Sequence, residues 1–264
     1  MAAPCALLLS HMEFLGHRVN DVLLPVISEV MATFPKKTLR IAPYANASQE
    51  LQREVDPIHS ALAEPNVDAY IAIWIKPELP DEEFQAALGE ELIHHLQAAD
   101  GAGVVDYVQG MTGDPVSIKE FWHSLSSIVL DLEVHKKLDE FGLHAPVRPA
   151  AMARFRHAIE YAEQNPESHQ RGKQKFGPLP TYLLWFWDLH ILGDDETRAE
   201  FAGLQQRIWA ISPDDVRELW ERISQKLIGR PAEDLRMVAA ELGCRIRIIP
   251  KGTMGKTLLI DGGV

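Results

Sequence analysis

The chain has 264 residues, 46% of them hydrophobic and 24% charged, which suits a folded soluble protein of one large domain or one domain with an appendage. Its 38 acidic and 26 basic residues give a formal net charge of −12, and because such a surface repels phosphate backbones, nucleic acid is not expected as a partner. Two cysteines at opposite ends of the chain, Cys5 and Cys244, and the lack of an apolar run of the ~20 residues that span a bilayer predict a cytoplasmic protein with no membrane partner.

The first half of the chain is predicted to alternate helices with strands. Apolar residues at steps of three and four predict a helix over residues 7–34, which Pro25 would kink. The β-branched and aromatic run 67–75 is the clearest strand. Three acids that suit the positive end of a helix dipole open a helix over 81–99. The other predicted elements are a strand over 38–42, a helix over 48–63 and a helix over 117–141.

The second half of the chain is predicted to be helical and to end in a β-hairpin. Glycines and prolines interrupt residues 164–180, which predicts a long loop or a subdomain boundary. The elements expected around it are a helix that ends near Gln164, an aromatic core segment at 185–187, helix starts at Ser212 and Pro231, and hairpin strands at 245–249 and 257–260. We therefore expect two domains, residues 1–163 and 164–264.

The helix predicted over 81–99 carries the residues best suited to chemistry. Glu90 and His94 are four residues apart, so they project from one face of the helix and could hold one metal ion. Glu91 lies one position round the helix, where it could reach a water molecule beside that ion.

This helix resembles the HExxH helix of the zincin metallopeptidases, with Glu90 in place of the first histidine. The next helix has Asp131 and then His135 and Gly142, which looks like the pattern that closes the site in a small cytosolic, gluzincin-like form of the family, with His135 at an asparagine position. The resemblance covers about residues 8–145. It implies an α+β fold with a mostly helical domain and a small sheet, to which we add the helical C-terminal part and its hairpin.

The resemblance also implies the roles of the site residues. Glu90, His94 and Asp131 would bind zinc, Glu91 would be the general base, and the strand 67–75 would hold an extended peptide or protein substrate by backbone hydrogen bonds. A carboxylate at position 90 adds negative charge, which lowers the Lewis acidity of the metal and favours harder ions such as manganese. The expected function is that of a zinc- or manganese-dependent hydrolase.

Other interpretations of these residues stay open. The chain could be an inactive zincin-fold protein that binds a peptide or protein, or the acids and histidines could form a solvated helix face. The neighbouring register, Glu91 with His95, offers a second pair, and His135 could be a ligand instead of Asp131. A di-iron bundle built on Glu91, His94 and the pair Glu120–His123 is disfavoured, because glycines and a proline leave no room for the intervening helix.

Overall fold

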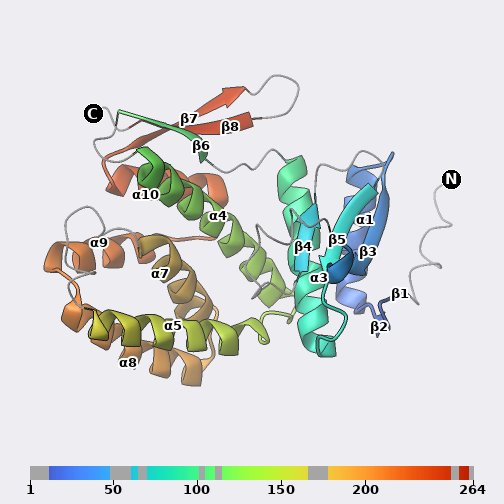
Figure 1. The fold of residues 1–264 in the computed structure, drawn as a ribbon, viewed down its shortest axis with the longest axis horizontal. Helices are drawn as coiled ribbons and strands as arrows, with labels where there is room; N and C mark the ends of the chain where they lie inside the picture. Colours follow the sequence, from blue (N-terminus) through green and yellow to red (C-terminus); the bar gives the residue numbers. More distant parts are fainter. Residues whose placement is uncertain are drawn as a thin grey trace. The chain divides into compact units, whose positions relative to one another are not determined.

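The computed structural model describes residues 12–47, 61–64, 70–100, 105–110, 115–165, 178–250 and 256–261. The chain divides into two units, each of which is described by itself (Figure 1). The first unit comprises residues 1–100 and 137–146, and the second comprises residues 101–136 and 147–264. Within the described ranges, no helix is both long enough and apolar enough to cross a membrane.

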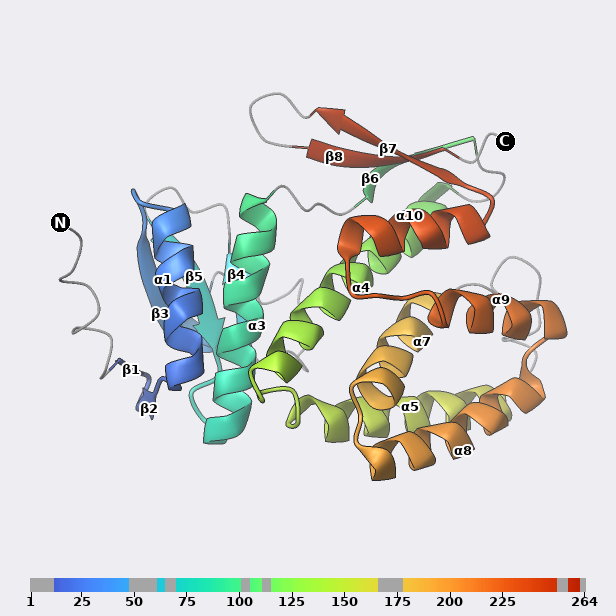
Figure 2. The same ribbon diagram turned by 180° about the vertical axis from the view of Figure 1, so that it is seen from behind.

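The first unit contains a three-stranded sheet with two helices on one face. Its strand order is β3 (Thr38–Pro43), β5 (Tyr70–Ile75) and β4 (Ala61–Glu64), with β3 parallel and β4 antiparallel to β5. Helices α1 (Leu24–Thr33) and α3 (Asp81–Ala99) lie side by side against this sheet (Figure 2). The residues of β5 from Ile71 to Ile75 are all buried, so the strand predicted most clearly from the sequence forms the centre of the sheet.

A short hairpin precedes these elements. It consists of β1 (Glu13–Phe14) and β2 (His17–Arg18), and a 3-10 turn, η2 (Asp21–Leu23), leads from it into α1. A second 3-10 turn, η3 (Tyr44–Asn46), follows β3.

The second unit is mainly helical and has an aromatic core. Its helices are α4 (Pro115–Glu140, of which residues 137–140 belong to the first unit), α5 (Val147–Gln164), α7 (Leu179–Trp185), α8 (Asp195–Ile211), α9 (Asp214–Ser224) and α10 (Pro231–Glu241). The π-helical turn η5 (Phe186–Ile191) continues α7. Trp122, Phe155, Tyr182, Phe201 and Trp220 are among the largest buried side chains. The prediction that residues 185–187 belong to the core is confirmed.

A second three-stranded sheet lies in the same unit. Its order is β6 (Val105–Gln109), β8 (Lys256–Asp261) and β7 (Arg245–Pro250), and β7 and β8 form the predicted antiparallel hairpin. Strand β6, which lies between the helices predicted over 81–99 and 117–141 and was not expected, pairs in parallel with β8. Residues on either side of the predicted boundary at 163/164 therefore share one sheet.

Helices α5 and α8 run in parallel, next to each other (Figure 2). Three ion pairs join them in the same order along both helices: Arg148 with Asp194, Arg156 with Glu200, and Glu163 with Arg207. The arginine belongs to α5 in the first two pairs and to α8 in the third, so the polarity of the pairs reverses along the contact.

The structure confirms the mostly helical α+β class and corrects two of the predicted elements. The helix predicted over 7–34 is wrong at residues 13–18, which form the hairpin, and Pro25 lies in the first turn of α1 rather than at a kink. The helix predicted over 48–63 is wrong at its end, where 61–64 form β4, and its residues 48–60 lie outside the described part of the chain. The resemblance to zincins and the domain boundary stay predictions.

Candidate functional site

Helix α3 holds Glu90, Glu91 and His94 on a closely packed part of the first unit. A Cβ atom added to Gly89 would lie 2.8 Å from Leu138 Cδ2, so the helix approaches its neighbours closely just before the acids. Glu91 is buried, whereas Glu90 and His94 are only partly so. The two predicted metal ligands on α3 thus remain accessible, and the predicted base lies on the buried side of the helix.

The ring of His94 is oriented by a neighbour on its own helix. Its Nδ1 lies 3.1 Å from Oε1 of the buried Gln97, and because an amide oxygen accepts, Nδ1 is the donor. In the neutral imidazole the lone pair is then on Nε2. Metal-binding histidines commonly donate their other nitrogen in this way, so the geometry of His94 suits a ligand.

His95 has a structural role in the alternative register. Its Nε2 lies 3.3 Å from the carbonyl oxygen of Ala72 on β5, and Phe34 packs edge-on to its ring with 6.4 Å between centroids. Burial lowers the pKa of His95, and the hydrogen bond to the Ala72 carbonyl opposes this shift only in part. His95 is therefore neutral near pH 7, and its Nε2 ties α3 to the sheet.

The third predicted ligand, Asp131, is a partly buried residue of α4 in the second unit, whereas Glu90, Glu91 and His94 belong to the first. Closure of the site by Asp131 stays a prediction. Among the described residues of the first unit taken alone, no three side chains of the metal-binding types lie close enough to share an ion. By itself this unit offers the pair Glu90–His94 and not a full set of ligands.

Strand β5 cannot hold a substrate in the way the zincin resemblance implies. It is the central strand of its sheet, with Tyr70–Ile75 paired to β3 on one side and Ala72–Ile75 paired to β4 on the other. Because both neighbours already use its backbone groups, the expectation that this strand binds extended substrate is wrong. The outer edges of the sheet belong to β3 and β4.

The second unit contains a buried histidine–carboxylate pair that sequence reasoning did not find. Nδ1 of His135 on α4 lies 2.6 Å from Oδ1 of Asp188, and the two side chains are 8% and 2% exposed. Asp188 belongs to the π-helical turn η5, where the Leu192 amide donates to the Trp187 carbonyl five residues earlier. Single π-helical turns occur frequently at functional sites.

A tightly packed loop lies beside this pair. Gly229 has a φ of +67°, and a Cβ atom added to it would lie 2.8 Å from the Trp187 ring and 3.0 Å from Cδ of Lys136. The Lys136 ammonium donates to the Ile228 carbonyl at 3.1 Å. Lys136 and Trp187, which adjoin His135 and Asp188 in the sequence, thus both contact the loop that contains Ile228 and Gly229.

The buried carboxylate of Asp234 fixes that loop from its other side. It accepts from the backbone amides of Ile228 at 3.0 Å and Arg230 at 2.9 Å. Burial raises the pKa of Asp234, while these backbone hydrogen bonds oppose the shift.

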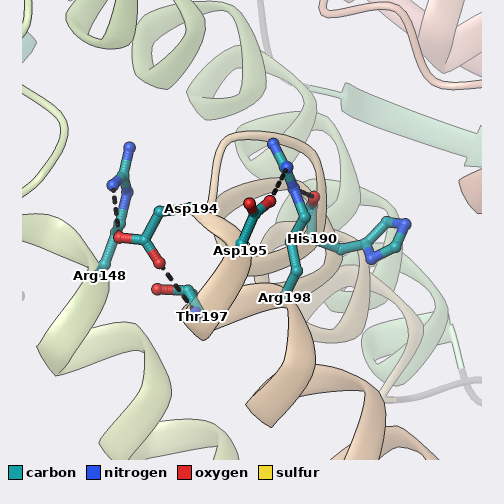
Figure 3. Close-up of polar contacts among 6 residues, drawn as sticks. All are labelled: Arg148, His190, Asp194, Asp195, Thr197 and Arg198. Carbon is teal, nitrogen blue, oxygen red and sulfur yellow. Dashed lines mark hydrogen bonds and ion pairs between the residues drawn. The ribbon is translucent and has the colours of Figure 1, made fainter.

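Polar contacts at the start of α8 fix the far end of η5 (Figure 3). Asp194 accepts from the Thr197 amide at 2.8 Å and pairs with Arg148 at 3.4 Å, and the Thr197 amide lowers the pKa of Asp194. Arg198 donates to the His190 carbonyl at 3.0 Å and pairs with Asp195 at 3.1 Å. Burial lowers the pKa of His190. These contacts connect the end of η5 and α5 to the start of α8, so we assign the cluster a structural role.

The sequence contained only part of the signal for the buried pair. His135 stands at the asparagine position of the zincin-like pattern, but Asp188 is 53 residues away and lies in an aromatic run with no motif of its own. Comparisons of the chain with protein families, with curated proteins and with solved structures find no match.

Proposed function

We propose that this chain binds a transition-metal ion of the zinc class and that His135 is one of its ligands. The observation that carries the proposal is the hydrogen bond from His135 Nδ1 to Asp188. A carboxylate that accepts from Nδ1 fixes the tautomer, leaves the lone pair on Nε2 and raises the basicity of that nitrogen, which is the usual arrangement around metal-binding histidines.

Charge balance supports a cation at this place. Asp188 is 2% exposed, and burying an ionised carboxylate is unfavourable unless a positive charge compensates it. A protonated His135 would compensate it, but so would a divalent ion bound to the neutral ring. Zinc combines well with imidazole nitrogen and carboxylate oxygen, and manganese prefers the oxygen.

The face of α3 that carries Glu90 and His94 is a second candidate, and it is the one that would make the protein a hydrolase. The hydrogen bond from His94 Nδ1 to Gln97 favours it, because the ring then presents Nε2 as a ligand. A bound zinc or manganese ion would polarise the carbonyl of a peptide or protein substrate. Glu91 would accept the proton of the attacking water. The proposal places this activity in the cytoplasm.

Metal analysis of chelator-free protein tests both candidates. We expect about one zinc-class ion per chain after reconstitution. The His135→Ala variant should lose it, whereas Asp188→Asn should keep it with an affinity lower by about 10- to 100-fold, as for other residues that orient a ligand. The matched control is His157→Ala, an exposed histidine of α5 that should bind the ion normally. Cobalt substitution provides a spectroscopic readout that does not depend on activity.

A further variant, His94→Ala, distinguishes the two candidate sites. Loss of the ion in His94→Ala with retention in His135→Ala would move the site to α3. In that case Glu91→Gln should keep the ion and abolish hydrolysis of a peptide substrate. A wild-type protein that binds no zinc, cobalt or manganese would refute the metal proposal and leave a peptide- or protein-binding role.

A further inference from the structure

The short hairpin of the first unit has a turn that is unfavourable by itself. The turn residues Leu15 and Gly16 both have positive φ values, 55° and 87°. Glycine adopts this conformation readily, but a leucine there is strained by about 1–2 kcal/mol. Two residue pairs, Glu13–Arg18 and Phe14–His17, connect the strands, and the Val19 amide donates to the Met12 carbonyl at 2.9 Å just beyond them. An isolated two-stranded hairpin of this length is marginally stable at best. Other contacts must therefore stabilise the hairpin.

His17 supplies such contacts with both of its ring nitrogens. Nδ1 lies 2.9 Å from the Asp81 carboxylate, at the start of α3, and Nε2 lies 3.3 Å from the Pro77 carbonyl oxygen. The ring also stacks on Phe84, with 4.1 Å between centroids and 12° between planes. The ring of His17 thus connects the turn end of the hairpin to the first turn of α3 and the loop before it.

Both partners of the His17 ring nitrogens are acceptors, and this sets the charge that the contact requires. A neutral imidazole has one donor and one lone pair, so it would satisfy one acceptor and repel the other, whereas the imidazolium ion donates to both. Asp81 is the charged group in contact with the ring, and its hydrogen bond raises the pKa of His17 above the ordinary value of 6.5. The other charged residues on these elements are Glu13 and Arg18 on the hairpin and Glu82 and Glu83 in the first turn of α3.

A contact that does not titrate holds the chain directly after His17. The buried side chain of Gln85 donates to the Arg18 carbonyl at 2.8 Å and accepts from the Asn20 amide at 2.9 Å. The side-chain amide and the backbone groups of this clamp do not ionise, so its hydrogen bonds do not depend directly on pH. Residues 18–20 are therefore fixed independently of the charge of His17.

We propose that protonated His17 is a pH-sensitive latch that holds the β1–β2 hairpin on α3 and releases residues 13–17 when the ring loses its proton, while Gln85 retains residues 18–20. The direction of the pH dependence follows from the linkage between proton binding and attachment of the hairpin. A group whose pKa is higher in the attached state contributes fully below its ordinary pKa and loses its contribution as the pH rises through the raised value. The latch is closed below the ordinary pKa of 6.5 and opens as the pH rises through the raised pKa of His17.

Hydrogen exchange by NMR on the full chain tests the latch. After correction for the intrinsic rate at each pH, we expect the protection of the amides of residues 14–17 to fall severalfold between about pH 5.5 and 8.5. The Asn20 amide, which binds Gln85, is the internal control and should change little. The ring protons of His17 should titrate with a midpoint above 6.5.

Two variants separate the latch from simple packing. His17→Phe keeps an aromatic ring for Phe84 and cannot ionise, so protection of residues 14–17 should be low and independent of pH. Asp81→Asn should move the His17 midpoint downward while the fold is retained. The proposal is overturned if His17 titrates at or below 6.5, or if the wild-type protection is as independent of pH as that of His17→Phe.

Discussion

The two units bury histidines among different partners. In the first unit, His95 is 2% exposed and meets a neutral carbonyl, so burial keeps its ring uncharged. In the second unit, His135 is 6% exposed as a residue but meets the carboxylate of Asp188. A neutral partner leaves no charge to balance, whereas a buried carboxylate does. The nature of the partner, rather than burial, therefore distinguishes a candidate metal ligand from a histidine of the core.

The largest change in the free energy of unfolding is expected when the charged partner of His135 is replaced by a neutral one, such as His95 has. Asp188→Asn replaces the carboxylate with a neutral amide, and removal of one member of a buried charge pair costs about 3–5 kcal/mol. The free energy of unfolding of the second unit should fall by that amount. Urea unfolding with a chelator present, followed by tryptophan fluorescence, measures it, because every tryptophan except Trp74 belongs to this unit.

Asp195→Asn is the matched control, since Asp195 lies in the first turn of α8 and its side chain is fully exposed. Surface substitutions of this kind change stability by about 0.5 kcal/mol or less. If Asp188→Asn costs no more than Asp195→Asn, the pair carries no net charge interaction and the contrast with His95 fails.

A somewhat smaller effect is expected from the loop beside the pair. Gly229→Ala adds a methyl group 2.8 Å from the Trp187 ring at a φ of +67°. Overpacking costs about 1–3 kcal/mol and the left-handed conformation about 1–2 kcal/mol, so we expect a loss of about 2–5 kcal/mol in the same unfolding experiment.

Gly243→Ala separates the two contributions. Gly243 has nearly the same φ, +72°, and a Cβ atom there would have no neighbour within 4 Å. Its loss should be limited to the backbone strain of about 1–2 kcal/mol. Equal losses in the two variants would mean that the loop yields easily, and that Trp187 and Asp188 lack the rigid surroundings described above.

The pH dependence of the first unit tests the neutral state of His95. Because burial lowers the pKa of His95, the unfolded chain binds the proton more readily than the folded one. The contribution of His95 is complete above its ordinary pKa of 6.5 and is lost as the pH falls through the lowered value. Urea unfolding followed by the methyl resonances of Ile71 and Ile73 should show decreasing stability below about pH 6.5.

In His95→Gln this acid sensitivity should be reduced, because the amide can still donate to the Ala72 carbonyl but does not titrate. An unchanged pH profile would assign the effect to another group of the first unit. His95 would then no longer serve as the neutral member of the comparison.

The smallest effect concerns the exposed ion pair between α5 and α8. The Arg207 guanidinium holds the pKa of Glu163 below its ordinary value of 4.5, mainly through their hydrogen bonds. In Arg207→Ala the Glu163 pKa should return towards 4.5, with hardly any change in the unfolding curve, because exposed pairs are screened by solvent. An NMR titration of Glu163 measures the shift, with Arg236→Ala on α10 as the control.

Several elements were predictable because local signals define them. The helix predicted over 81–99 agrees with α3, whose first turn is acidic, and the alternating strands near the C-terminus form β7 and β8. The hairpin at residues 13–18 was not predictable from periodicity, because Leu15 continues the apolar stripe of a helix while its backbone turns the other way. Strand β6 is short and flanked by glycines, and its partner β8 is about 150 residues away.

The candidate sites also differ in whether a local sequence signal defines them. The spacing of Glu90 and His94 follows from one helix, and the structure does place both on α3. The pair His135–Asp188 joins α4 to a π-helical turn 53 residues later, and no local pattern relates the two. A sequence pattern can indicate which residues share a helix face, but it does not show which distant side chain that face will meet.

The reversal of charge along α5 and α8 has a consequence for their alignment. If α8 slid by seven residues in one direction, Arg207 would lie opposite Arg156, and in the other direction Glu200 would lie opposite Glu163. Both shifted alignments bring like charges together, and only the observed one pairs opposite charges at every step. These exposed ion pairs therefore add little to the free energy of unfolding. Their main effect is to favour the observed register of α8 along α5 over the two shifted ones.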